Sequence, residues 1–163
     1  MFGLLLSGAV VILSLYSVLK YSGNRKLRTV GKSVMITGCD SGVGLSLAIT
    51  AKTFGFHVIA TCLNISGPGA LHLKKKFPDI LVIPMDVTNQ ADIDYALQRV
   101  REHLQETQTG LWGLINNAGV LVYGHFDWQV DHQIQMQIKV NFLGMLQVTK
   151  TFLPLVRKAK GKS

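Results

Sequence analysis

The fold of this chain is decided by residues 33–44, which read SVMITGCDSGVG. The first five, Ser33–Thr37, are mostly apolar and rich in β-branched side chains, so they predict a buried strand. Glycines follow at positions 38, 42 and 44, and an apolar pattern with helical period runs from Gly42 to Phe54. The segment therefore predicts a strand that turns into a helix through a glycine-rich loop.

Each glycine of this loop has a use in such a turn. Gly38 permits the tight turn, Gly42 lets the backbone approach a pyrophosphate, and Gly44 lets the helix pack on the strand. The N-terminus of the helix would then present N–H groups to the phosphates. Glycines that serve only the turn are the alternative, and the loop by itself leaves that alternative open.

Strand and helix patterns alternate along the rest of the chain. Strands are predicted at residues 57–62, 80–84 and 111–116, and helices at residues 68–76, 91–105 and 131–158. One face of helix 91–105 carries Ile93, Leu97, Val100 and Leu104. Strands separated by helices imply right-handed crossovers. The sequence therefore predicts an α/β fold with a doubly wound parallel sheet covered on both faces.

Two further motifs follow predicted strands. Asp86-Val87-Thr88 comes after the third strand, and Asn116-Asn117-Ala118-Gly119 comes after the fourth. Taken alone, Asp86 fits a helix start and Asn117 fits a turn. However, both motifs and the glycine loop fall at the carboxyl ends of parallel strands, where open α/β sheets bind their ligands. Their common placement predicts a binding site.

Together these motifs resemble the short-chain dehydrogenase/reductase family. The resemblance covers residues 32–163 and rests on TGxxxGxG at 37–44, DVT at 86–88 and NNAG at 116–119. Within the family, GLWGLINNAG at 110–119 and FLPL at 152–155 resemble the cluster of retinol, hydroxysteroid and 3-hydroxybutyrate dehydrogenases. The resemblance implies a Rossmann-type sheet, here incomplete, with its first four strands in the order 3-2-1-4.

The resemblance also implies an activity and a set of site residues. The activity is an NAD(P)-dependent interconversion of a primary or secondary alcohol and its carbonyl, on a lipophilic substrate such as a steroid or a retinoid. Glycines of the loop would hold the cofactor phosphates, Asp86 with Val87 would border the adenine, and Asn117 with Gly119 would line the nicotinamide ribose. The implied cofactor-binding residues are Thr37, Gly38, Asp40, Ser41, Gly42, Val43, Gly44, Asp86, Val87, Asn117, Ala118 and Gly119.

The catalytic residues of the family are largely absent. Asn141 takes the position of the family's catalytic asparagine, although by itself it also fits a polar helix residue. The family's serine and its Tyr-x-x-x-Lys have no counterpart, because the string Tyr16-x-x-x-Lys20 precedes the first strand. We therefore expect a fragment or truncated form that is inactive alone. The alternative is a non-catalytic, membrane-anchored module that binds a dinucleotide or a partner.

NAD is the expected cofactor, with NADP less favoured. An acid at the tip of the second strand would bind the ribose 2′-OH and a basic residue there would bind a 2′-phosphate, but Cys62, Leu63 and Asn64 offer neither. Asp40 in the glycine loop would repel a 2′-phosphate, and that loop contains no Lys or Arg. The loop therefore favours NAD.

The N-terminal region is expected to be a membrane anchor. No charge occurs between Phe2 and Leu19, and such a run nearly spans a bilayer. A signal peptide or organellar presequence and a buried helix are the alternatives. The expected organisation is an anchor at 1–20, a basic linker at 21–31 and a partial NAD(P)-binding domain at 32–163. The expected location is a single-pass protein of the endoplasmic reticulum, or alternatively of a mitochondrial membrane.

Charge and cysteine content exclude other classes. The net charge is +8, but no basic stripe alternates with stacking aromatics, so nucleic acid is not an expected partner. Cys39 and Cys62 have no metal-ligand spacing, so we expect reduced core thiols and no metal site. The expected partners are a lipophilic substrate and the membrane, with a homodimer in a full-length form only.

Overall fold

The computed structural model describes residues 28–160, which form one parallel sheet in the order β3-β2-β1-β4. β1 spans Lys32–Ile36, β2 His57–Cys62, β3 Leu81–Pro84 and β4 Gly110–Ile115. The chain steps from β1 outward to β3 and then returns to the other side of β1 as β4. A crevice for ligands is expected where this reversal occurs, between β1 and β4. The predicted sheet and its strand order are confirmed.

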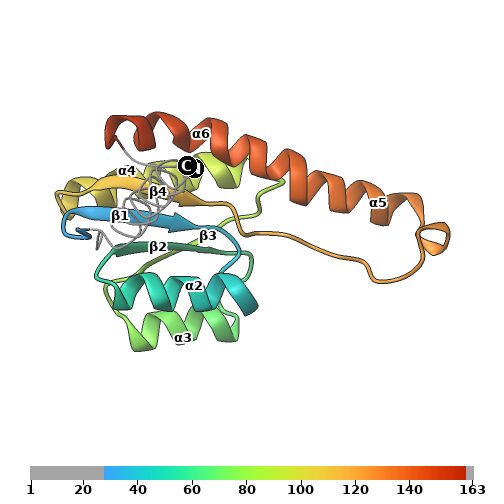
Figure 1. Ribbon diagram of the computed structural model, residues 1–163, viewed down its shortest axis with the longest axis horizontal. Coiled ribbons are helices and arrows are strands. Elements are labelled where there is room, and N and C mark those ends of the chain that lie inside the picture. The colour runs from blue at the N-terminus through green and yellow to red at the C-terminus, as the bar shows by residue number, and fades with distance from the viewer. Residues whose placement is uncertain (1–27, 161–163) are drawn as a thin grey trace, which may run out of the picture.

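Helices cover both faces of the sheet, as Figure 1 shows. α2 (Gly42–Thr53) and α3 (Pro68–Lys76) lie on one face, and α4 (Gln90–Glu106) and α6 (Met145–Lys158) lie on the other. Successive strand residues point to opposite faces, so Met35 belongs to the apolar cluster under α4 and α6 while Ile36 belongs to the one under α2 and α3. Burial on both faces explains why the strands read as continuous apolar runs.

The apolar face predicted for the helix after β3 is confirmed. Ile93 and Val100 on α4 are fully buried, and Leu97 and Leu104 pack against the same cluster. The N-terminus of α4 is capped by Asn89, whose side chain accepts a hydrogen bond from the Ala91 N–H at 3.0 Å. Asp86 is therefore not the residue that caps this helix.

β4 contains a bulge that the sequence pattern does not indicate. Ser33 pairs with Leu111 but Val34 pairs with Gly113, so Trp112 is an extra residue on β4. Its ring stacks on Phe56, with 5.7 Å between centroids, and the Lys32 ammonium lies 4.9 Å from the ring centroid. The bulge places Leu111 and Leu114 in the same cluster although they are three residues apart.

The last predicted helical region, 131–158, is helical but not uniform. α5 (Asp131–Ile138) passes into a π-helix, η2 (Lys139–Gly144), and then into α6. In Figure 1 this helical arm extends beyond the sheet at its α5 end, where a loop with the short 3₁₀-helix η1 (Phe126–Trp128) precedes it. π-helical turns are frequent at functional sites, and this one contains Asn141.

The expected fold class needs one correction. Within residues 28–160, no helix combines the length and the apolar character that a membrane crossing requires, so the transmembrane helix is removed from the fold class. The segment 1–20, to which that helix was assigned, lies outside the described residues.

We predict that His103 makes the stability of the fold sensitive to acid. His103 lies on α4 near its C-terminus, and its Nε2 is buried without a hydrogen-bond partner among residues 28–160. Burial lowers the pKa of this imidazole below its ordinary value of 6.5. Below that pH the unfolded chain takes up a proton that the folded chain resists, so the free energy of unfolding should fall as pH falls.

The measurement is a series of urea titrations between pH 8 and pH 5, on the wild type and on His103→Leu. The variant should lose less stability than the wild type between these two pH values, because it has removed the group that resists protonation. At pH 8 the imidazole is neutral in both the folded and the unfolded state. The difference in the free energy of unfolding between the wild type and His103→Leu at that pH therefore reflects only the change in packing. Parallel pH curves for the two proteins would contradict the prediction.

Candidate functional site

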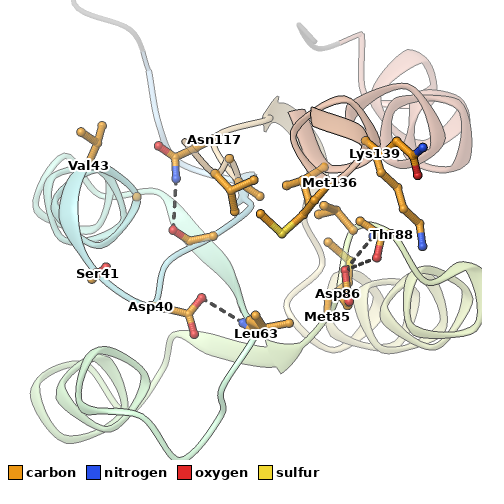
Figure 2. A pocket seen from close by; sticks show the side chains of 18 of the residues that line it. Asp40, Ser41, Val43, Leu63, Met85, Asp86, Thr88, Asn117, Met136 and Lys139 are labelled. Atoms are coloured by element: carbon orange, nitrogen blue, oxygen red, sulfur yellow. Dashed lines mark hydrogen bonds between the residues drawn. The ribbon is translucent and has the colours of Figure 1, made fainter. Parts of the chain in front are cut away.

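A cavity of about 780 Å³ opens at the carboxyl ends of the strands. Its walls are the glycine loop, the residues that follow β2, β3 and β4, and one side of α5 and η2. All three sequence motifs contribute to it, and Figure 2 shows their side chains around it. The structure thus brings together the predicted site residues Gly38, Asp40, Ser41, Val43, Gly44, Asp86, Val87, Asn117, Ala118 and Gly119.

The glycine loop has the backbone that its sequence predicts. Gly38 and Gly42 have φ angles of +69° and +56°, a region that side chains with a Cβ rarely adopt. A Cβ on Gly42 would meet nothing within 4 Å, whereas one on Gly44 would lie 2.2 Å from the Gly38 carbonyl oxygen. Gly42 therefore leaves open space at the start of α2, and Gly44 allows α2 to approach the loop.

Thr37 and Asn117 connect the glycine loop to the segment after β4. The Thr37 Oγ1 accepts hydrogen bonds from the N–H groups of Asn117 and Ala118, both at 3.0 Å. The Asn117 side-chain amide donates to the carbonyl oxygens of Thr37 at 2.9 Å and Gly38 at 3.1 Å. Thr37 is buried and does not line the cavity, so its contribution is to hold the loop. The side chain of Asn117 points at the loop rather than into the cavity (Figure 2).

Asp86 forms a turn of its own at the end of β3. Its Oδ1 accepts hydrogen bonds from the Thr88 N–H and the Thr88 hydroxyl, both at 2.8 Å. Behind it, a Cβ on Gly144 would lie 2.9 Å from the Val87 carbonyl oxygen, so η2 packs closely on this turn. Asp86 and Val87 therefore face the cavity from a segment that is fixed on both sides.

Asn141 connects the π-helix to the segment that follows β4. Its Oδ1 accepts a hydrogen bond from the Val120 N–H at 2.8 Å, and its Nδ2 donates to the Val120 carbonyl oxygen at 2.7 Å. Both hydrogen bonds of the side chain are with the backbone of Val120, and the side chain lies next to Gly119. Asn141 borders the cavity residues Gly119 and Val140 without lining the cavity itself.

Sequence reasoning missed a second group of cavity residues. The cavity residues on α5 and η2 recur at helical spacing along one side of the helix, and this spacing is visible in the sequence. Lys139 lies on the Asp86 side of the cavity, away from Asp40 (Figure 2). The missed lining residues include Met85, Val120, Met136 and Lys139.

The two cysteines are free and buried beside this site. Burial, with the neighbouring Cys62, raises the pKa of the Cys39 thiol to about 12. Burial, with the charge of Asp40, raises the pKa of the Cys62 thiol to about 12 as well. Neither is a thiolate at neutral pH, so neither is a nucleophile. The described part of the chain also contains no cluster of side chains suited to a metal ion.

The parallel sheet, the glycine loop at the start of α2 and the crevice at the strand ends define a Rossmann-type dinucleotide-binding domain. The family model for short-chain dehydrogenases matches residues 32–162. The chain belongs to the short-chain dehydrogenase family. Members of this family bind a nicotinamide dinucleotide.

The curated relatives confirm the resemblance read from the motifs. The chain is 42% identical over 145 residues to 17-beta-hydroxysteroid dehydrogenase type 2 of Homo sapiens, covering 86% of this chain and 36% of that protein. Segments 63–70 and 148–155 resemble that enzyme. Retinol dehydrogenase 7 of Mus musculus is 39% identical over 156 residues, which are 94% of this chain and 48% of the relative. The mitochondrial D-beta-hydroxybutyrate dehydrogenase of Rattus norvegicus is 38% identical over 81% of this chain and 39% of its own length.

A solved structure with the same fold is the NADPH-bound carbonyl reductase from chicken fatty liver. It matches with a TM-score of 0.70 and 32% sequence identity, over 78% of this chain and 49% of that one. The chain therefore spans between about a third and a half of the length of these relatives.

Proposed function

We propose that this chain binds NAD in the cavity at the strand ends, as the cofactor-binding part of an alcohol dehydrogenase. The observation that carries the proposal is the open space at Gly42, where the glycine loop leads into α2 beside a cavity of about 780 Å³. Backbone N–H groups at this helix start would receive the pyrophosphate. The family and the agreement of all three motifs on one cavity support the proposal.

Each part of the cofactor has candidate partners. The loop from Gly38 to Gly44 would hold the pyrophosphate, with Ser41 and Val43 at its rim. Asp86 and Val87 would border the adenine. Ala118 and Gly119 would line the nicotinamide ribose, and Asn117 would support that side by holding the loop.

NAD is proposed over NADP because of the charge near the expected ribose. Asp40 lines the cavity beside the tip of β2, and no Lys or Arg lines that end of it. A 2′-phosphate there would meet a carboxylate. The similar carbonyl reductase from chicken fatty liver binds NADPH, so its cofactor carries the 2′-phosphate that Asp40 would repel here.

The proposed reaction of the whole protein is the interconversion of an alcohol and its carbonyl on a lipophilic substrate such as a steroid or a retinoid. The names of the relatives 17-beta-hydroxysteroid dehydrogenase type 2 and retinol dehydrogenase 7 support this substrate class. Asn141 would stand at the catalytic end of the cofactor site. No Tyr-x-x-x-Lys follows Lys20 in the sequence, so we propose that the 163-residue chain alone does not catalyse the reaction.

A second candidate function is a non-catalytic module that binds a dinucleotide or a partner. The observation that favours it is the combination of a complete glycine loop with the missing tyrosine and lysine. Location in the endoplasmic reticulum or mitochondrion stays a prediction, and so does a homodimer of a full-length form. The rat relative is mitochondrial by name.

The test is a calorimetric titration of the purified 163-residue chain with NAD and with NADP. We expect NAD to bind about tenfold more tightly than NADP, which corresponds to about 1.4 kcal/mol. We expect no oxidation of estradiol or retinol. Absence of binding for both dinucleotides would overturn the proposed function. Turnover by the chain alone would overturn both the proposed inactivity and the non-catalytic module.

A further inference from the structure

The acid nearest the expected ribose comes from the glycine loop and not from the tip of β2. This acid is Asp40, and its carboxylate lies at the tip of β2. Oδ2 accepts a hydrogen bond from the Leu63 N–H at 2.9 Å, and Oδ1 accepts one from the Asn64 N–H at 2.8 Å. Figure 2 shows Asp40 beside Leu63 at the edge of the cavity. Each carboxylate oxygen has a second acceptor site, so both bonds leave capacity for a ribose hydroxyl.

The backbone of Asp40 rests directly on α3. A Cβ built on Gly69 would lie 2.0 Å from the Asp40 carbonyl oxygen and 2.6 Å from its carbonyl carbon. Both contacts are with main-chain atoms, which cannot move aside as the end of a flexible side chain could. Gly69 is buried in the first turn of α3. Only a residue without a Cβ fits here while the loop keeps its present position.

We propose that Gly69 is a positioning residue that sets the choice between NAD and NADP by holding Asp40 in place. The inference rests on the proposed binding of a dinucleotide in this cavity. With a methyl group at position 69, the Asp40 main chain must move away from α3, and its carboxylate then loses the fixed geometry to the Leu63 and Asn64 amides. A carboxylate that is no longer held at the tip of β2 repels the 2′-phosphate of NADP less strongly.

The experiment measures the dissociation constants of NAD and NADP for the 163-residue chain and for Gly69→Ala. In Gly69→Ala, the dissociation constant of NADP divided by that of NAD should fall from about 10 to about 2, because the affinity for NADP rises relative to the affinity for NAD. Leu71→Ala is the matched control, since Leu71 lies on the exposed side of the same helix and its truncation should leave the ratio unchanged. An equal loss of affinity for both dinucleotides in Gly69→Ala would overturn the inference.

A double-mutant cycle tests whether Gly69 acts through Asp40. Asp40→Asn alone should reduce the ratio to about twofold, and adding Gly69→Ala should reduce it no further. Independent, multiplicative effects of the two substitutions would overturn the inference. If the wild type binds neither dinucleotide, the proposed function itself fails, which is a different result from a wild type that binds and a variant that keeps its preference.

A second variant addresses the same contact if Gly69→Ala does not fold. Asn64→Pro removes the N–H that Asp40 Oδ1 accepts and leaves the α3 contact intact. It should lower the preference for NAD, whereas Asn64→Ala keeps that N–H and should preserve the preference. Equal preferences in the two variants would show that the position of Asp40 does not set the choice.

Discussion

Replacing Gly44 with alanine should weaken NAD binding by about 100-fold or more, equivalent to at least about 2.7 kcal/mol. A Cβ at this position would lie 2.2 Å from the Gly38 carbonyl oxygen and 2.4 Å from the Asn117 Nδ2. Both atoms belong to the contact that holds the glycine loop against the segment after β4. The substitution therefore displaces the loop that would receive the pyrophosphate. Overpacking of this kind also lowers the free energy of unfolding, by about 3 kcal/mol.

Gly31→Ala is the matched control for this substitution. Gly31 has a φ of +72°, and a Cβ there would meet nothing within 4 Å. It lies in the turn before β1, away from the cavity, so its replacement adds backbone strain of about 1 to 2 kcal/mol without a clash. NAD affinity measured by calorimetry should be unchanged in Gly31→Ala. Retained NAD affinity in Gly44→Ala would mean that the loop does not receive the cofactor.

Phe152→Ala should lower the free energy of unfolding by about 3 to 5 kcal/mol. Phe152 on α6 is fully buried in the cluster between the sheet and the α4 and α6 layer, and it is among the largest buried side chains of the described residues. Whole domains are stable by only about 5 to 15 kcal/mol, so this loss is a large part of the total. Urea titration followed by circular dichroism measures it as a shift of the midpoint.

Phe142→Ala provides a comparison with the same change of side chain on the same helical arm. Phe142 lies in η2 and is 55% exposed, so its truncation leaves no buried cavity and should cost less than about 1 kcal/mol. The difference between the two losses in the free energy of unfolding gives the contribution that burial makes at Phe152. Equal losses of unfolding free energy in the two variants would show that Phe152 is not packed between α6 and the sheet.

The strands and the loops that carry the site could be predicted from local patterns in the sequence. Alternating strand and helix patterns and the glycines at 38, 42 and 44 are local signals, because periodicity and backbone stereochemistry depend on neighbouring residues. The placement of Asp86 and Asn117 at strand ends follows from the same patterns. The strand order is implied by the resemblance to the family, and the sheet of the structure confirms it.

Which atoms meet across the site depends on the tertiary structure. Asp40 binds amides 23 and 24 residues further along the chain, and Asn117 binds carbonyl groups about 80 residues earlier. No periodic pattern records such pairs, because they depend on how closely the loops and helices pack. The same holds for Gly69 under Asp40 and for the π-helix at Asn141. These positions are set by packing between segments far apart in the chain, which local propensity does not encode.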